Sequence, residues 1–205
     1  MNEEKKMYTQ VVVGELGVNC YLVPGPVSGN LYIIDPGDDA DVILHAAEKY
    51  TFKEAAILLT HAHVDHIGAC GELSRALNIK QVYIHPDDQA FYASPLNCFL
   101  PWLPAAENLP PAADFPQQQD FEVIHTPGHT NGGVCFLFKE YNTIFTGDTL
   151  FRGSYGRTDL GGNMDQLMNS LKNILFKLSD DLKVCPGHDA SSSIGYEKQF
   201  NPCLS

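Results

Sequence analysis

The sequence predicts a single domain of mixed α and β structure, on three observations. Short runs of β-branched and aromatic residues alternate with segments whose apolar residues have helical spacing. The 205 residues, 44% of them hydrophobic and 19% charged, suffice for one full core and exclude a chain that is disordered as a whole. The second half repeats the order of elements of the first, without a repeat of fixed period. We therefore expect one domain over residues 1–205.

The first half is predicted to open with an antiparallel meander and to continue with helices between strands. Gly and Pro turns separate three β-rich runs, and a later continuous apolar run is typical of a buried strand. A short helix should begin after Pro86. In order, the other expected elements are strands at 8–13, 19–23 and 31–34, a helix at 41–50, a strand at 55–59, a helix at 70–77 and a strand at 82–84.

A long irregular segment is expected to join the two halves. Residues 94–119 contain six prolines around the only tryptophan of the chain, Trp102, which argues against regular structure there. Such a loop serves either as a lid or binding loop or as a plain connector, and both roles stay open. Beyond it, strands are predicted at 121–125, 134–138, 143–146 and 183–185, with a helix at 164–178.

Charge and cysteine usage exclude several classes of partner. Thirteen Lys and Arg against 25 Asp and Glu give a formal net charge of -12, which disfavours nucleic acid and anionic lipid as partners. No apolar stretch is long enough to span a membrane, and residues 1–10 resemble neither a secretory signal nor a transit peptide, so we expect a cytoplasmic location. Six scattered cysteines without a CxxC pair are expected to be reduced and mostly buried, which argues against a thiolate metal site.

The candidate functional residues are histidines and aspartates at the ends of predicted strands. His61, His63, Asp65 and His66 form the stretch THAHVDH directly after the strand at 55–59. Residues two apart in an extended segment point the same way, so His61 and His63 can present two ring nitrogens to one ion. Asp65 and His66 lie beyond the following turn and are expected to face a second ion. Burying these groups without a metal would be costly.

Three further candidates follow later strands, each directly after a glycine. They are His129, Asp148 and His188, preceded by Gly128, Gly147 and Gly187. Glycine lets the backbone approach closely and turn, so that each side chain can be aimed at a shared pocket. Taken singly, each would be an ordinary polar residue. Together with THAHVDH they indicate a metal centre.

The HxHxDH stretch, combined with these three residues, resembles the pattern of the metallo-β-lactamase superfamily. The stretches FRGSYGRTDLGG at 151–162 and IGYEKQFNP at 194–202 resemble its glyoxalase II-like subgroup, whose members are hydroxyacylglutathione hydrolases. This chain stops before the C-terminal helical domain of the full-length members. The resemblance implies a four-layer αββα sandwich with the site at the sheet edge, between two similar halves.

The resemblance also implies two divalent metal ions. One would be held by His61, His63 and His129 and the other by Asp65, His66 and His188, with Asp148 bridging both. Zinc is the first expectation, with iron or manganese as alternatives, because histidine and aspartate donors accept all three metals.

The implied reaction is the hydrolysis of a small thioester, such as an S-2-hydroxyacylglutathione, to a hydroxy acid and a thiol. Two cations would ionise a water molecule for attack on the carbonyl, and Asp65 is a candidate to orient that water and take up a proton. Arg152, Tyr155 and Arg157 are candidates to bind a thiol carrier with carboxylates. The sequence equally allows Arg157 to pair with Asp159 and Tyr155 to pack.

Other functions stay open on the same fold. Persulfide dioxygenases share a GRTD stretch, here at 156–159, but use one iron held by two histidines and a carboxylate, which here would be His61, His129 and Asp148. The complete second group of ligands favours the hydrolase. The net charge disfavours a phosphodiesterase or nuclease, and open coordination positions disfavour a metal buffer. The expected partner is a small-molecule thioester, and the sequence indicates no oligomeric state.

Two residues outside this set are candidates to orient a ligand histidine. Asp35 lies in the turn IDPG, where it could instead bond only its own backbone, and His125 lies shortly before Gly128. His45 and His85 are expected to be surface or local polar residues.

Overall fold

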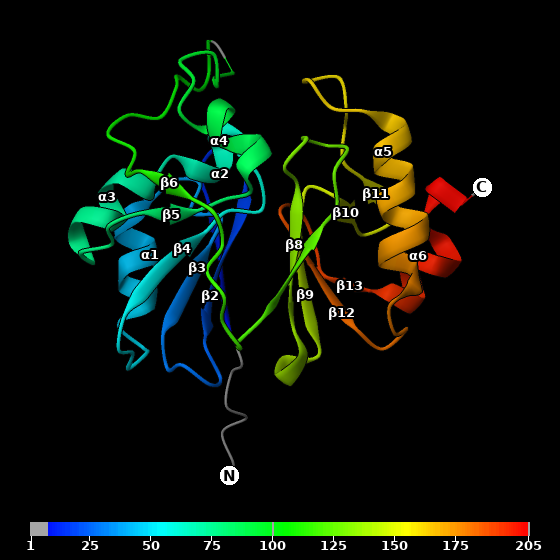
Figure 1. The fold of residues 1–205 in the computed structure, drawn as a ribbon, viewed down its shortest axis with the longest axis horizontal. Helices are drawn as coiled ribbons and strands as arrows, with labels where there is room; N and C mark the ends of the chain where they lie inside the picture. Colours follow the sequence, from blue (N-terminus) through cyan, green and yellow to red (C-terminus); the bar gives the residue numbers. More distant parts are fainter. Residues whose placement is uncertain (1–7, 100, 205) are drawn as a thin grey trace.

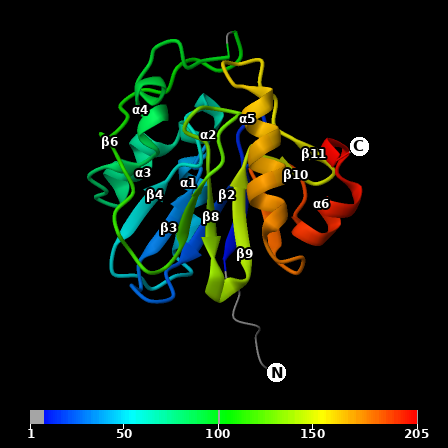
Figure 2. The same ribbon diagram turned by 45° about the vertical axis from the view of Figure 1, so that its right-hand side comes forward.

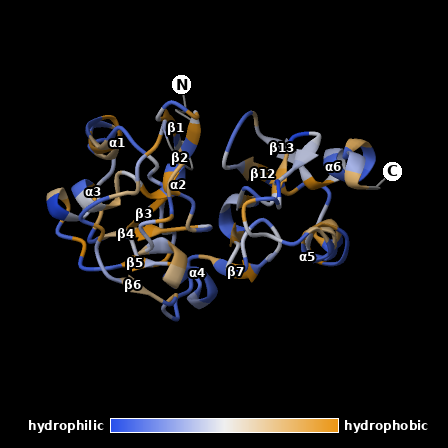
Figure 3. Ribbon diagram, turned by 90° about the horizontal axis from the view of Figure 1, so that it is seen from above, coloured by the Kyte–Doolittle hydropathy of each residue, from blue (hydrophilic) through white to orange (hydrophobic). Residues whose placement is uncertain are grey.

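Two β-sheets face each other in the computed structural model, which describes residues 8–99 and 101–204, and helices cover their outer faces (Figure 1, Figure 3). This arrangement of layers confirms the expected αββα sandwich. Residues 1–7, on which most of the expectation about an N-terminal signal rests, lie outside the described residues. In the described part of the chain, no helix has both the length and the apolar character needed to cross a bilayer.

The first sheet has the strand order β1-β2-β3-β4-β5-β6. Its first three strands form the predicted antiparallel meander, and the pairs from β3 to β6 are parallel. Its strands are β1 (Thr9–Val13), β2 (Val18–Pro24), β3 (Leu31–Ile34), β4 (Ala55–Leu58), β5 (Val82–Tyr83) and β6 (Ala112–Ala113). The helices of this half are α1 (Ala40–Ala47), α2 (Val64–Ile67), α3 (Cys70–Ala76) and α4 (Pro86–Tyr92).

The second sheet has the order β13-β12-β9-β8-β7. Its parallel pair is β9 with β12, and its other pairs are antiparallel. The strands are β7 (Glu122–His125), β8 (Val134–Phe138), β9 (Thr143–Gly147), β12 (Lys183–Pro186) and β13 (Ser192–Ser193), with a separate hairpin of β10 (Leu150–Phe151) and β11 (Ser154–Tyr155). Its helices are α5 (Met164–Asn169) and α6 (Ile194–Phe200), and short 3-10 turns lie at Lys139–Tyr141 and Pro202–Leu204.

The core strands are apolar on both faces because each sheet is covered on both sides. In β3, Leu31 and Ile33 pack with α1 and α3, whereas Tyr32 and Ile34 pack into a central cluster between the sheets. Successive residues of β8 alternate in the same way between the central cluster and the cluster under α5. This double burial explains why these strands are continuous apolar runs in the sequence.

The predicted helix at 164–178 is confirmed over residues 164–177, but it is not one uniform α-helix. It begins as α5, continues as a π-helical segment over Ser170–Ile174 and ends in a 3-10 turn over Leu175–Lys177. Leu167, Leu171 and Leu175 are all buried against the second sheet. An α-helix has 3.6 residues per turn, so residues four apart are separated by slightly more than one turn, and successive leucines would move around the helix axis. A π-helical segment has more residues per turn. It therefore offsets this movement and keeps all three leucines on the sheet.

Most other differences from the predicted elements are short. The segment at 94–119 is irregular as expected, except that Ala112–Ala113 pairs with β5 and Phe99 forms an isolated bridge with Leu103. The elements α2, β10, β11, β13 and α6 were not predicted, because runs of two to seven residues carry little periodicity. All six cysteines are free, and all but Cys98 are buried, which confirms the expectation for them.

The central cluster provides the first test. Phe145 is fully buried, and its ring centroid lies 4.8 Å from that of Tyr21 and 5.6 Å from that of Phe138. We expect Phe145→Ala to lower the free energy of unfolding by about 3–5 kcal/mol, measured by urea denaturation. Phe200, which is 56% exposed on α6, is the matched control, and its replacement by alanine should cost less than about 1 kcal/mol. An equal loss of unfolding free energy in the two variants would contradict this account of the core.

Candidate metal centre

The predicted histidines and aspartates converge where the C-terminal ends of β4, β9 and β12 meet. Gly187 donates a backbone hydrogen bond to Gly147 O at 2.8 Å, which ties the segment after β12 to the end of β9. Gly147 in turn lies against Thr60, which follows shortly after the end of β4. The two sheets therefore deliver their strand ends to one edge.

One group of donors comprises three buried imidazoles. His61, His63 and His129 each offer a ring nitrogen within 4.8 Å of the others. The ring centroids lie 4.5 Å apart for His63 and His129, and 4.8 Å apart for His61 with either of the other two. This arrangement agrees with the first predicted set of ligands.

A second group of donors lies beside the first. Asp65, His66 and His188 offer ligand atoms within 4.8 Å of one another. Asp148 lies between the groups, with Oδ1 at 3.4 Å from His66 Nε2 and Oδ2 at 3.6 Å from both His129 Nε2 and His188 Nε2. Its carboxylate therefore lies close to members of both groups.

Unpartnered polar atoms test whether metal ions fit these groups. The buried atoms His61 Nε2, His63 Nε2, His129 Nε2 and Asp148 Oδ1 have no hydrogen-bond partner among the described residues. Leaving such an atom unpaired costs about 1–3 kcal/mol. Divalent cations would satisfy these atoms together, and histidine with aspartate is a donor set that zinc, iron and manganese accept. The two clusters therefore suit two metal ions.

The second ring nitrogen of several histidines is held by a neighbouring group. His129 Nδ1 lies 2.7 Å from Arg157 O, and His188 Nδ1 lies 3.1 Å from Leu16 O, so each ring donates an N–H to a backbone carbonyl. His61 Nδ1 lies 3.0 Å from Thr60 Oγ1. Contacts of this kind fix the ring orientation and leave Nε2 free to face an ion.

Asp35 lies beside His66, where the orienting role that the sequence left open is possible. Its carboxylate accepts hydrogen bonds from Thr60 N at 2.8 Å and Thr60 Oγ1 at 2.6 Å, and its Oδ2 lies 3.1 Å from His66 Nδ1. Asp35 adopts a left-handed backbone with φ of 51°. Aspartate and asparagine tolerate that conformation better than other non-glycine residues, and it suits the turn that follows β3.

His125 contacts His85 and Asn131, and neither of these residues is among the predicted metal ligands. Its ring stacks on His85 with centroids 4.2 Å apart and planes 10° apart, and its Nε2 lies 2.9 Å from Asn131 O. With Asp87 these two histidines form a further group of possible ligand atoms on the surface. Two parallel rings cannot both have one ion in their planes, so this group carries no metal site as it stands.

Asp88 and Asn97 support the centre and were not predicted. Asp88 is buried and accepts hydrogen bonds from Ala62 N at 3.1 Å and Gly132 N at 2.6 Å, which joins the loop of His61 and His63 to the loop that follows His129. Asn97 donates to Ala62 O at 2.5 Å. Burial raises the pKa of Asp88, while hydrogen bonds from its partners oppose that shift. No sequence signal separates Asp88 from its exposed neighbour Asp87.

The glycines before three candidate ligands have the roles that the sequence predicted. Gly128 and Gly147 adopt positive φ angles of 140° and 47°. A Cβ atom at Gly187 would collide with the Asp148 carboxylate and the His66 ring. Larger side chains are therefore excluded where the ligand loops meet.

The two groups of donors differ in their protonation. Burial, reinforced by the neighbouring imidazoles, lowers the pKa of His61, and burial lowers the pKa of His63 to about 3. For His66, burial also lowers the pKa, but the charges of Asp148 and Asp65 outweigh it and raise the pKa. His188 follows the same balance and also has a raised pKa. Protons thus supply positive charge to the second group when no cation is bound.

The two carboxylates of the centre remain ionised. Burial alone would raise the pKa of Asp65 and Asp148, but the positive charge of His66 outweighs burial and holds both pKa values below the usual range. Ionised carboxylates are the form that binds a metal ion.

The three predicted substrate contacts lie on the segment after Asp148. Arg157 donates from Nε to Asp159 Oδ1 at 2.6 Å and from Nη2 to Asp159 Oδ2 at 2.5 Å. The Arg152 guanidinium lies 5.3 Å from the ring centroid of Tyr196, and Tyr155 packs against the cluster under α5. Of the three, Arg157 lines a cavity beside the metal centre, and their roles in binding stay a prediction.

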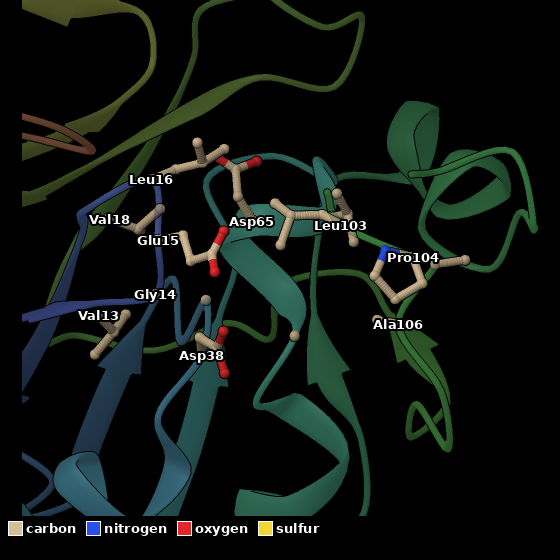
Figure 4. Close-up of a pocket in the computed structure, with 14 residues that line it drawn as sticks. Val13, Gly14, Glu15, Leu16, Val18, Asp38, Asp65, Leu103, Pro104 and Ala106 are labelled. Carbon is tan, nitrogen blue, oxygen red and sulfur yellow. The ribbon is translucent and has the colours of Figure 1, made fainter. Parts of the chain in front are cut away.

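Two cavities adjoin the centre and share Glu15, Leu16 and Leu103. The smaller has a volume of about 190 Å³ and includes Asp65 in its wall. Figure 4 shows Asp65 and Glu15 on one side of this cavity, with Leu103 across from them. The larger, of about 460 Å³, is also lined by Phe99, Trp102, Arg157 and Leu160.

Comparisons with known proteins agree with this geometry. The family model described as the metallo-beta-lactamase superfamily matches residues 13–188. Hydroxyacylglutathione hydrolase GloC of Haemophilus influenzae is 34% identical over 186 residues, which cover 86% of this chain and 88% of GloC. A structure of TTHA1623 in a di-iron-bound form matches with a TM-score of 0.86 at 37% identity, over 95% of this chain and 98% of that one. ETHE1 from Myxococcus xanthus matches with a TM-score of 0.73 at 29% identity, over 95% and 83% respectively.

The raised pKa values of His66 and His188 predict an order of metal release. As the pH falls, protons compete first for these two imidazoles, whereas the lowered pKa values of His61 and His63 keep their nitrogens free. Dialysis at pH values from about 8 to about 5 should therefore remove one of two metal equivalents first. A His188→Ala variant should hold about one metal ion per chain at the highest pH. It should retain that ion over the pH range in which the wild type falls from two metal ions to one. Simultaneous release of both metals from the wild type would refute this order.

The hydrogen bonds that Asp88 accepts predict that substitutions of Asp88 and of its neighbour Asp87 differ in their effects on stability and metal affinity. In Asp88→Asn, an amide group replaces one acceptor oxygen, so either Ala62 N or Gly132 N loses its partner. We expect a loss of about 1–3 kcal/mol in unfolding free energy and a metal affinity lower by about 10-fold. Asp87→Asn, on the same turn of α4 and exposed, should change neither quantity. Equal behaviour of the two variants would rule out this role for Asp88.

Proposed function

Because the chain belongs to the metallo-beta-lactamase superfamily, a superfamily of metal-dependent hydrolases, we propose that it is a dinuclear hydrolase of small thioesters. The observation that carries this proposal is the pair of complete donor groups with the Asp148 carboxylate between them. The similarity to GloC along most of both chains supports the thioester as substrate. In this proposal the substrate is an S-2-hydroxyacylglutathione or a related thiol ester, and hydrolysis yields a hydroxy acid and a thiol.

Seven side chains would hold two metal ions in the proposed enzyme. His61, His63 and His129 would hold one ion, and Asp65, His66 and His188 the other, with Asp148 shared. When bound, such cations polarise a carbonyl group and make water a better nucleophile near neutral pH. Zinc is our first expectation for the ions, and the di-iron form of TTHA1623 supports iron as the alternative.

The protein's own groups would orient and protect the reacting atoms. Asp65 lines the smaller cavity, and its lowered pKa keeps its carboxylate ionised, so it can accept a hydrogen bond from the attacking water. The rings of Phe91 and Phe99 lie 5.8 and 5.9 Å from that of His63 and limit access of bulk water from that side. A thiol has an ordinary pKa of about 8.5, so the leaving group can depart as a thiolate without a proton donor.

A second candidate function is a mononuclear iron oxidoreductase of the persulfide dioxygenase type. The likeness to ETHE1 at 29% identity keeps this candidate open. It would need only His61, His129 and Asp148 as ligands, which leaves the second donor group without a role.

Metal content and thioester turnover test the two candidates together. We expect about two metal ions per chain and a fall in thioester hydrolysis of at least about 100-fold in both His63→Ala and Asp148→Ala, because each removes a proposed ligand. His45→Ala is the matched control, since His45 is exposed on α1 and its Nδ1 lies 3.2 Å from Glu48, at the end of that helix. Retained turnover in either ligand variant would overturn the dinuclear hydrolase. About one iron per chain, with oxygen consumed on addition of a persulfide, would favour the second candidate.

A further inference from the structure

Apolar side chains from three separate loops line the larger cavity beside the metal centre. Leu16 comes from the turn between β1 and β2, Trp102 from the segment after α4, and Leu160 from the segment after β11. Figure 2 shows the last two segments, green and yellow, on the same side above the sheets. Trp102 is 73% exposed, Leu16 50% and Leu160 39%. Large apolar groups left this exposed around one cavity indicate a binding surface.

This cavity adjoins both groups of metal ligands. The backbone carbonyl of Leu16 holds His188, and that of Arg157 holds His129. The ring of Phe99, which also lines the cavity, lies 5.9 Å from that of His63. A group bound in the cavity is therefore next to the atoms that would react.

The cavity offers no free positive charge to an anionic ligand. Arg157 is the one cation that lines it within the described chain, and its guanidinium donates from Nε and Nη2 to the two carboxylate oxygens of Asp159, which balances its charge. The hydrogen bonds from Arg157 lower the pKa of Asp159 to about 2, so this carboxylate stays ionised and keeps the pair together at neutral pH. Glu15 and Asp38 add two carboxylates to the adjoining smaller cavity. Glutathione carries two carboxylates and one ammonium group, so its two carboxylates would meet repulsion here and only its ammonium group would meet opposite charge.

We propose that the larger cavity binds an apolar, uncharged part of the substrate, so that the enzyme prefers thioesters of neutral thiols to those of glutathione. This inference rests on the proposed hydrolase function and specifies its substrate class. In the reaction, water adds its oxygen to the carbonyl carbon and the C–S bond breaks. The products are a carboxylate, a neutral thiol and one proton.

The single tryptophan gives a direct measurement of binding. Trp102 lines the cavity, and it is the only tryptophan of the chain, so its fluorescence reports occupancy of this cavity without turnover. The probes are two thioethers that cannot be hydrolysed, S-hexyl-N-acetylcysteamine and S-hexylglutathione, added to the metal-loaded protein. We expect the neutral probe to bind at least 10-fold more tightly. Equal binding, or tighter binding of S-hexylglutathione, would overturn the proposal.

Matched leucine variants test the position of the site. Leu160→Ala removes apolar surface from the cavity and should weaken binding of the neutral thioether by about 5-fold to 10-fold. Leu96 is 81% exposed on the segment that also carries Trp102, but it does not line the cavity, so Leu96→Ala should leave binding unchanged. Equal effects of the two substitutions would place the probe elsewhere and contradict the proposal.

Turnover of matched thioesters separates this proposal from the proposed function. S-hexanoyl-N-acetylcysteamine should have a kcat/KM at least 10-fold above that of S-hexanoylglutathione. Asp159→Asn frees the Arg157 guanidinium and should narrow this ratio by raising kcat/KM for the glutathione thioester. Hydrolysis of both compounds with glutathione preferred would overturn the apolar site and leave the hydrolase intact. Tight binding of the neutral thioether without hydrolysis of either thioester would support the apolar site and overturn the hydrolase.

Discussion

The crowding of imidazoles and carboxylates at one edge is the constraint on which the rest of the structure depends. The buried Nε2 atoms of His61, His63 and His129 lie close to one another, and none has a hydrogen-bond partner among the described residues. The carboxylates of Asp65 and Asp148 add negative charge that nearby protons on His66 balance only in part. Such an arrangement is stable only if positive charge fills it, and the fold must hold the donors in place until that happens.

The sandwich supplies this rigidity by joining two sheets through an aromatic core. Phe145 of β9 packs against Tyr21 of β2, so the strand that leads to Asp148 is fixed to the first sheet. Tyr21 also donates to Pro186 O at 2.8 Å, which fixes the strand that leads to His188. Residues far apart in the chain are thereby held with the precision that ligand geometry needs.

Sequence reasoning identified the donors because they follow strand ends and carry glycines beside them, and both signals are local. The sequence allowed two interpretations of Asp35, a contact with a histidine or a bond to its own backbone. An aspartate in a turn has the same local pattern whether or not a histidine lies nearby. Asp88 was missed because its partners, Ala62 N and Gly132 N, lie on loops that only the tertiary structure brings together. The π-helical segment was missed for a similar reason, because the sheet beneath it selects that turn.

Backbone carbonyls, rather than side chains, connect the loops of the cavity to the metal ligands. Leu16 O holds His188 and Arg157 O holds His129, so the identity of the side chain at either position is irrelevant to that support. During evolution, the side chains at positions 16 and 157 can therefore change to suit a new substrate, while the backbone hydrogen bonds that orient His188 and His129 are kept. The fold separates the part of each loop that is free to vary from the part that is not, which is how one metal centre can be reused for many substrates.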